Sequence, residues 1–176
     1  MREAATKESR RILPFPERRI PLKINATYTG SDIDSIKLGL IPETMEEKWF
    51  IYLNEDWLYF HRSWTGACIF GVKFKIEASN CSVLESWANR DKDQYNSDDA
   101  GYDQKLVLFL IDALLLKKSV EFPRPAELPE LPPGIYQHHV VGQAHPEIRI
   151  PKSSQSNGLW KRIIYWLKGN SKHKEK

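Results

Sequence analysis

The chain has 176 residues, of which 41% are hydrophobic and 28% are charged, and its formal net charge is +3. This length and composition suit a globular domain with its own core and exclude a chain that is disordered throughout. The first residues contain no apolar leader, and no apolar run approaches the roughly 20 residues that span a bilayer. We therefore expect a cytoplasmic protein.

Charge is distributed unevenly along the chain. Residues 1–23 hold seven Lys or Arg against three Glu, a net +4, and residues 152–176 hold seven against one, a net +6. Residues 24–151 hold twelve basic against nineteen acidic residues, a net −7. An acidic body argues against nucleic acid gripped by the folded domain. We predict a flexible basic N-terminal arm over 1–23, a single domain over 24–150 and a basic tail over 151–176.

The two cysteines, Cys68 and Cys81, are too few for the disulfide framework of a small secreted domain. Cys68 falls within an apolar alternating pattern, which predicts a buried, reduced thiol. Because no paired Cys or Cys/His spacing suits zinc, the sequence predicts no metal and no cofactor.

The first predicted elements are short. Weak alternation predicts an edge strand over Lys23–Thr29. A helix is predicted over Ser31–Leu40, with Ser31 as its N-cap and Asp34 three residues later. Gly39 ends this predicted helix.

Three consecutive antiparallel strands are predicted within Lys48–Glu77. Alternation in the first two strands places apolar side chains on both faces, so we expect both faces of the sheet to be covered. One face of the first strand carries Trp49, Ile51 and Leu53, and the other carries Phe50 and Tyr52.

A fourth strand is predicted over Cys81–Trp87, followed by a polar loop over Asn89–Asp99 and a helix over Ala100–Lys118. The helix carries a broad apolar surface, which predicts that it packs across the sheet. The predicted fold class is therefore α+β, an antiparallel sheet of four or more strands packed against one long helix, with short additional helices.

The chain beyond this helix is predicted to be less regular. Five prolines between Pro123 and Pro133 predict an extended linker over 121–134. Residues 135–150 are typical of one or two short strands that return to the domain. The segment Leu159–Leu167 predicts a short amphipathic helix in the basic tail.

A polar and aromatic cluster closes the second predicted strand. Arg62 can bind a phosphate or carboxylate with two hydrogen bonds, His61 can act as an acid or base, and Trp64 can stack on a base or ribose. A structural interpretation stays open, with a histidine satisfied by backbone, an arginine paired to an acidic loop, and a turn. The cluster comprises His61, Arg62, Ser63, Trp64 and Thr65.

Two histidines later in the chain are candidates for the same surface. His138 and His139 join it if the linker returns the chain to the sheet. Adjacent residues on a strand point to opposite faces, so the pair is a poor metal site. We assign them to ligand binding rather than to a metal.

An enzymatic alternative also stays open. Here His61 is the acid or base, Arg62 holds a phosphate, and Asp91 or Asp103 is a second carboxylate. This hypothesis requires the four side chains to converge on one pocket. The sequence contains none of the GxGxxG, GxxxxGK[ST], GxSxG, HExxH or CxxC signatures, so the reaction is not identified by motif.

The predicted C-terminal helix is a candidate for contact with a membrane surface or a protein partner. Its tryptophans suit an interface, and its basic residues suit anionic headgroups or an acidic partner. Docking on the domain itself is the third alternative. The residues concerned are Trp160, Lys161, Arg162, Ile163 and Trp166.

The string KWFIY…WLYFHRSWTG resembles uncharacterised bacterial proteins, some of which occur near ADP-ribosylation machinery. The resemblance covers roughly residues 45 to 145. It implies a bacterial cytoplasmic domain and a nucleotide-like ligand, and it supplies no catalytic residues.

These observations lead to a functional prediction. We expect a non-catalytic binding module that engages a protein partner or a phosphorylated small ligand through the His61–Thr65 surface. The alternatives are an enzyme acting on a nucleotide or ADP-ribose-like substrate, and an accessory protein that lies on a membrane through its basic C-terminal helix.

Overall fold

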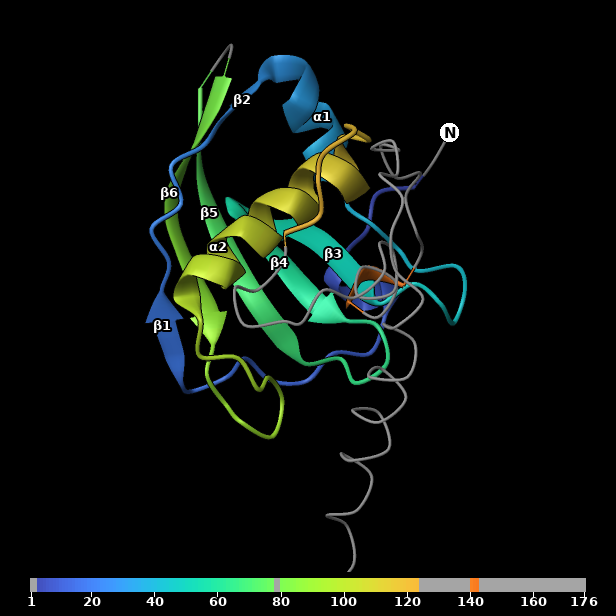
Figure 1. Cartoon of the computed structure of the whole chain (residues 1–176). Helices are drawn as coiled ribbons and strands as arrows, with labels where there is room; N and C mark the ends of the chain where they lie inside the picture. Colours follow the sequence, from blue (N-terminus) through green and yellow to red (C-terminus); the bar gives the residue numbers. More distant parts are fainter. Residues whose placement is uncertain (1–2, 78–79, 124–139, 143–176) are drawn as a thin grey trace, which may run out of the picture.

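An antiparallel sheet of six strands organises the chain. The structure is a computed structural model, and it describes residues 3–77, 80–123 and 140–142. The strands lie side by side in the order β1-β6-β5-β4-β3, and β2 pairs with the other end of β6 (Figure 1). Their bounds are Arg19–Pro21 (β1), Thr27–Thr29 (β2), Trp49–Asn54 (β3), Trp57–Arg62 (β4), Cys68–Ile76 (β5) and Asn80–Asn89 (β6).

The helical part of the predicted fold class is wrong, because the single long helix over 100–118 does not form. An α-helix, α2 (Ala100–Phe109), passes into a π-helical segment, η2 (Leu110–Leu115), for 16 residues in all. The other described helices are a 3-10 turn, η1 (Lys7–Ser9), and α1 (Gly30–Leu38). The described chain is therefore mostly sheet with short helices, rather than a sheet backed by one long helix.

The hydrogen bonding at the end of η2 explains why the helix ends at Leu115, before the predicted end at Lys118. The backbone N–H of Leu116 bonds to the carbonyl of Ile111, and Lys117 adopts a positive φ of 56°. Positive φ is unfavourable for a lysine and turns the chain away from the helical path. The apolar pattern continues to Leu116 but carries no signal for this change of hydrogen bonding.

Helix α1 begins one residue earlier than predicted. The cap is Thr29, whose side chain accepts a hydrogen bond from the backbone N–H of Asp32. The Asp32 carboxylate in turn accepts from the backbone N–H of Thr29 at 3.1 Å, which completes a capping box. Gly39 ends the helix with a φ of 63°, and a Cβ there would lie 2.3 Å from the carbonyl oxygen of Ile51.

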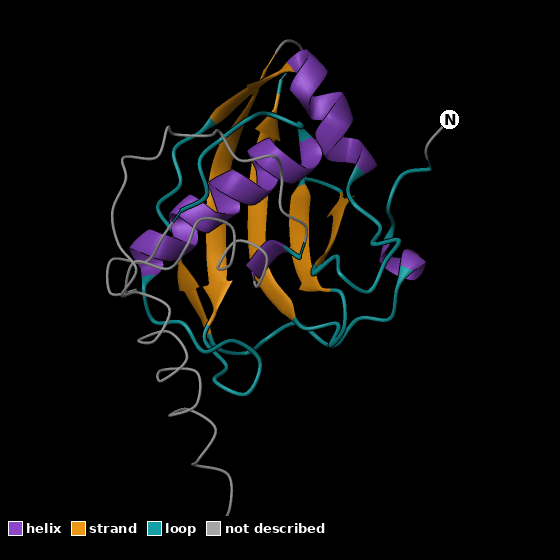
Figure 2. Ribbon diagram, turned by 45° about the vertical axis from the view of Figure 1, so that its right-hand side comes forward, coloured by secondary structure: helices purple, strands orange, loops and turns teal. Residues whose placement is uncertain are grey.

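The sheet buries apolar side chains on both faces, as strand alternation predicts. One face, called the helix face below, packs against α1 and α2, which lie on the same side of the sheet (Figure 2). The main core lies there. The opposite face holds a smaller cluster of Ala5, Phe50 and Tyr52, with Ile12, Ile41 and Tyr59 packed against it.

Residues 3–18, called the strap below, close this opposite face, which we call the strap face. The backbone N–H of Ala5 bonds to Leu38 at 2.8 Å, and that of Leu13 bonds to Gly66 at 3.0 Å. The ring of Phe15 lies 4.7 Å from that of Tyr59. The predicted basic arm therefore contacts the rest of the fold from Ala5 onward, and it continues into β1.

Several predicted elements lie outside the described residues. They are the linker beyond Pro123, the strands expected over 135–150 except for residues 140–142, and the helix over Leu159–Leu167. Within the described ranges, none of the helices has the length and apolar character that crossing a membrane requires.

Candidate functional site

The His61–Thr65 cluster comprises the last two residues of β4 and the turn that leads to β5. The backbone N–H of Arg62 bonds to Ala67 and that of Gly66 bonds to Arg62, both at 2.9 Å. Gly66 adopts a φ of 76°, and a Cβ there would lie 2.8 Å from the carbonyl oxygen of Arg11 in the strap. The turn therefore requires glycine both for its backbone angle and for the close approach of the strap.

His61 is fully buried on the strap face. Its Nδ1 lies 2.8 Å from the carbonyl oxygen of Gly66, and its Nε2 is buried without a hydrogen-bond partner. The ring stacks on Tyr52 with 5.5 Å between centroids and lies 6.0 Å from Phe50. Burial lowers the pKa of His61 below its ordinary value, and the hydrogen bond to Gly66 opposes this only in part. The imidazole is therefore neutral near pH 7 and has no access to an external substrate.

Arg62 points to the helix face, as strand alternation predicts for the neighbour of His61. Its guanidinium carbon lies 4.3 Å from the ring centroid of Trp49, and Nη1 donates to the carbonyl of Val140 at 3.1 Å. Trp49 Nε1 donates to the same carbonyl at 3.1 Å. The arginine thus joins the end of β4 to the described residues 140–142.

The two hydroxyls of the cluster are used within the fold. Ser63 Oγ donates to the carbonyl of Glu47 at 2.6 Å. Thr65 Oγ1 accepts from the backbone N–H of Ala67 at 3.2 Å. The Ser63 bond fixes the turn against the loop that precedes β3, and the Thr65 bond lies within the turn itself.

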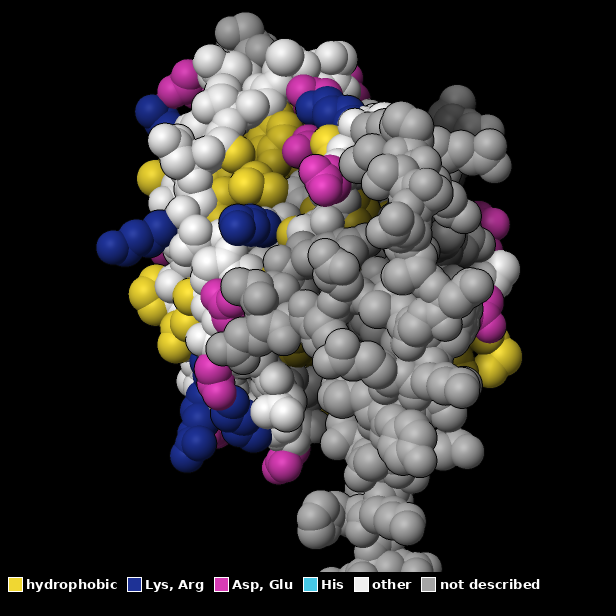
Figure 3. Space-filling view, in the orientation of Figure 1, with side chains coloured by type: hydrophobic (Ala, Val, Ile, Leu, Met, Phe, Trp, Pro, Cys, Tyr) yellow, Lys and Arg dark blue, Asp and Glu magenta, His cyan; other side chains and the backbone are white. Residues whose placement is uncertain are grey.

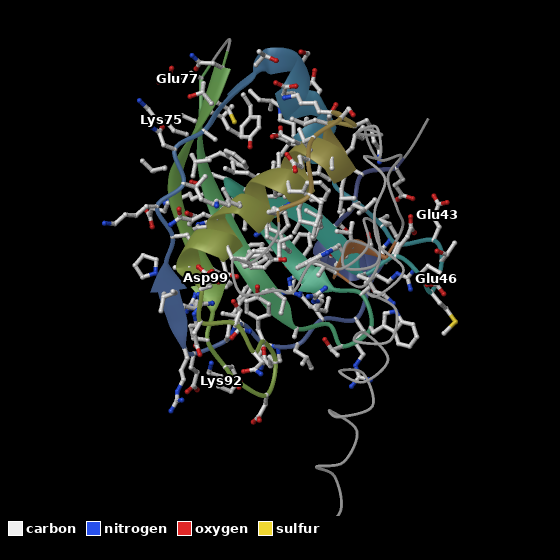
Figure 4. All side chains as sticks on the ribbon, in the orientation of Figure 1. Glu43, Glu46, Lys75, Glu77, Lys92 and Asp99 are labelled. Carbon is white, nitrogen blue, oxygen red and sulfur yellow. The ribbon has the colours of Figure 1, made fainter. Side chains whose placement is uncertain are left out.

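Trp64 is the residue of the cluster that presents a large side chain to solvent. It is 63% exposed, and Met45 beside it is 71% exposed. Trp64 Nε1 donates to the carbonyl of Met45 at 2.9 Å, and Lys48 Nζ lies 5.2 Å from the ring centroid. We call Trp64, Met45 and Lys48 the Trp64 surface. Figure 4 shows Glu43 and Glu46 projecting outward from the same loop.

The carboxylate of Asp103 lies in a separate buried network at the start of α2. It accepts from Arg90 Nη2 at 2.6 Å, from the Tyr95 hydroxyl at 2.6 Å and from Ser97 at 3.2 Å. The Tyr95 ring packs edge-on against Phe70, 5.6 Å away, in the main core. The network therefore lies on the helix face and secures the loop between β6 and α2.

The structure does not bring the proposed catalytic groups together. His61 lies on the strap face, whereas Asp103 lies on the helix face. Asp91 forms a turn in the loop, where its Oδ1 accepts from the backbone N–H of Asp93 at 3.1 Å. Arg62 lies over Trp49 on the helix face, on the opposite side of the sheet from His61. The single pocket that the enzymatic alternative requires is not formed by these four side chains.

Other predicted site residues lie outside the part of the chain that the structure describes. They are His138 and His139, and the helix residues Trp160, Lys161, Arg162, Ile163 and Trp166. Within the described residues, no three His, Cys, Asp or Glu side chains gather as metal ligands.

A hollow on the described surface lies away from the cluster. It encloses about 420 Å³ between the end of α2 and residues 120–123, and no residue of the His61–Thr65 turn lines it. On the face shown in Figure 3, the described acidic and basic side chains are interspersed rather than gathered by sign. This hollow therefore adds no ligand site to the cluster.

Sequence reasoning missed two residues of the Trp64 surface, Met45 and Lys48. A methionine in a charged loop directly before a buried strand is a usable signal, because a core position does not explain it. Its contact with Trp64 depends on the hairpin β3–β4, which brings Trp49 opposite Arg62. Comparison with known proteins adds no relative, since no family model, curated protein or solved structure matches the chain.

Proposed function

We propose that this protein is a non-catalytic binding module that engages a protein partner through the His61–Thr65 turn, with Trp64 as the contacting side chain. The observation that carries the proposal is that the Trp64 side chain is exposed and yet held in one orientation. Its indole is held by the hydrogen bond to Met45 and lies beside the Lys48 ammonium, while 63% of its surface is open.

Exposed, held aromatic side chains suit protein recognition. Tryptophan is among the residues that contribute most to binding energy at interfaces, and methionine is enriched there because it adapts to the shape of a partner. A side chain whose orientation is already fixed loses little conformational entropy on binding. Trp64 and Met45 together supply these properties at one edge of the turn.

A protein partner is favoured over a phosphorylated small ligand. Recognition of a phosphate by His61 needs the imidazole at the surface, but this side chain is fully buried. Arg62 lies over Trp49 and bonds to Val140, so its guanidinium already takes part in the fold. The contact area offered by the turn combines the apolar Trp64 and Met45 side chains with the Lys48 ammonium, which suits a surface of another protein.

We place this module in the cytoplasm of a bacterium. The buried, free thiols of Cys68 and Cys81 are compatible with a reducing compartment. This placement also follows the expectation of a bacterial domain that we drew from the KWFIY…WLYFHRSWTG string.

Replacing Trp64 by Ala tests the proposal, with Leu84→Ala as a matched control, since Leu84 is 57% exposed on β6. Partners captured from a bacterial lysate by the wild type are purified, and their affinity for each variant is measured by calorimetry. We expect Trp64→Ala to weaken binding by about tenfold or more, the cost of losing a contact worth at least roughly 1.4 kcal/mol. Leu84→Ala keeps wild-type affinity.

Circular dichroism and thermal melting establish that both variants fold. A folded Trp64→Ala variant that binds every captured partner with wild-type affinity overturns the proposal. Equal losses in Trp64→Ala and Leu84→Ala overturn the placement of the binding surface at the turn.

A further inference from the structure

We propose that the strap is a pH-sensitive cover, which protonation of His61 releases from the sheet. This device is independent of the Trp64 surface and of any partner. It rests on the geometry at the junction of the strap, β4 and the turn.

One carbonyl group joins His61 to the strap. The Gly66 oxygen lies 2.8 Å from His61 Nδ1 and accepts from the backbone N–H of Leu13 at 3.0 Å. A carbonyl only accepts, so Nδ1 carries the proton of the neutral ring, and Nε2 carries a lone pair. This Nε2 is buried without a partner. A second proton would therefore create a buried, charged donor with nothing to accept it, which is strongly unfavourable.

The elements packed against His61 supply no counter-charge. Tyr52 on β3 and Tyr59 on β4 both have a raised pKa because they are buried, that of Tyr52 to about 12. Cys68 on β5 pairs with His61 across the strands, and burial raises its pKa as well. All three groups are therefore neutral wherever a histidine titrates.

Charged groups act on the other residues around His61. Glu8 in the strap acts on Tyr52, Asp56 and Glu55 between β3 and β4 act on Tyr59, and Arg19 on β1 acts on Tyr59 and Cys68. Burial and the Gly66 carbonyl alone account for the altered pKa of His61, with no contribution from any of these charges. Protonation of His61 consequently leaves an uncompensated cation under the strap.

Of the segments packed around His61, the strap is the one that can open. The other sides are strands that are hydrogen-bonded to their neighbours, and the β4–β5 pairing shifts register between Phe60 and His61. Phe15 covers His61 from the strap with 6.3 Å between ring centroids, yet it is 42% exposed. A segment with few buried side chains opens locally at lower free energy than a central strand. Opening gives Nε2 access to water.

The direction of the pH effect follows from linkage. The pKa of His61 is lowered from 6.5 in the closed state, so the closed state binds fewer protons than the open state. The closed strap is therefore fully stable above that ordinary value. It loses stability as the pH falls below it and continues to do so down to the lowered pKa.

Thiol labelling of the full chain tests the proposal, because the two cysteines report on different places. Cys68 is fully buried beside His61 on the strap face, and Cys81 is buried where β6 pairs with β2. The probe is 4,4′-dithiodipyridine, which reacts in mild acid, and each rate is normalised to that of glutathione at the same pH. Mass spectrometry of peptides assigns the label to each thiol.

We expect the normalised rate at Cys68 to rise by about tenfold between about pH 7.5 and about pH 5, because an equilibrium linked to one proton changes by up to tenfold per pH unit. Cys81 stays protected. In His61→Asn, the amide can still donate to Gly66 but does not titrate, so labelling of Cys68 becomes independent of pH.

Three results overturn the proposal. They are a flat profile at Cys68 in the wild type, the same rise in His61→Asn, and equal rises at both thiols, which indicate global unfolding. If His61→Asn does not fold, hydrogen exchange of the Leu13 amide in the wild type decides. Exchange corrected for its intrinsic pH dependence must accelerate below about pH 6.5, and a constant protection factor rejects the strap as the moving part.

Discussion

The two faces of the sheet are closed in different ways. The helix face is covered by α1 and α2, whose buried side chains form one continuous cluster with those of the strands. The strap face is covered by an extended segment that contributes Ala5 to a much smaller cluster. Because burial of apolar area is the main favourable term in folding, the helix face supplies most of the stability. The strap face is the better place for a part that opens.

The two faces also treat buried polar groups differently. On the helix face, the Asp103 carboxylate has three hydrogen-bond donors around it. On the strap face, Nε2 of His61 has no partner. The Tyr28 hydroxyl, which also lacks a partner, is the exception on the helix face. A buried network in which every polar group has a hydrogen-bond partner makes a region rigid. A buried polar group without a partner destabilises the closed state, and opening of the segment that covers it removes this penalty.

The largest expected effect comes from truncating a strand residue on the helix face. Phe60 is fully buried in the main core, and Phe60→Ala should lower the free energy of unfolding by about 3–5 kcal/mol. The same change in the strap, Phe15→Ala, removes a side chain that is 42% exposed and should cost about 1 kcal/mol. Urea denaturation followed by circular dichroism measures both. Equal losses contradict the assignment of stability to the helix face.

A somewhat smaller effect should follow from breaking the Asp103 network. The Arg90–Asp103 pair is nearly inaccessible, so Arg90→Ala leaves a buried carboxylate without its cation, and we expect a loss of about 3 kcal/mol. Lys92→Ala removes a surface ion pair with Asp98 in the same loop and should leave the urea midpoint unchanged. Figure 4 shows Lys92 at the outside of this loop. If Arg90→Ala leaves the free energy of unfolding unchanged, the loop is held by its other contacts.

Much of the sheet can be read from alternation in the sequence. The pattern from Trp49 to Tyr52 has apolar residues on both faces, and the structure divides them between the two clusters as expected. The same rule places His61 and Arg62 on opposite faces. The helix at Ala100 also begins after a polar loop, where the Asp99 side chain caps it by accepting from the backbone N–H of Tyr102 at 2.9 Å.

The strap could not be predicted in the same way. Its contacts use backbone groups, such as the N–H of Leu13, and isolated side chains without a period. Proline and charge in residues 1–23 are typical of a flexible arm, and they are equally compatible with an extended segment on a sheet. The burial of His61 depends on this segment. The sequence therefore identifies the turn as polar and aromatic, but not which of its side chains remain exposed.

A smaller effect than that of Arg90→Ala tests how tightly the strap face is packed. The Trp87 ring lies against Gly71 on β5, where a Cβ would lie 2.4 Å from Trp87 Cε2. Gly71→Ala must therefore displace the indole, which also contacts Phe15 edge-on at 6.5 Å and lies 5.1 Å from the Arg19 guanidinium. We expect a loss of about 2 kcal/mol in urea denaturation, within the range for overpacking. Adding Trp87→Phe, whose ring is smaller, should recover part of this loss, which a double-mutant cycle measures as a favourable coupling. If the losses of unfolding free energy are additive in the double variant, the indole does not limit the space at Gly71. The strap face would then be as loosely packed around Trp87 as it is at Phe15.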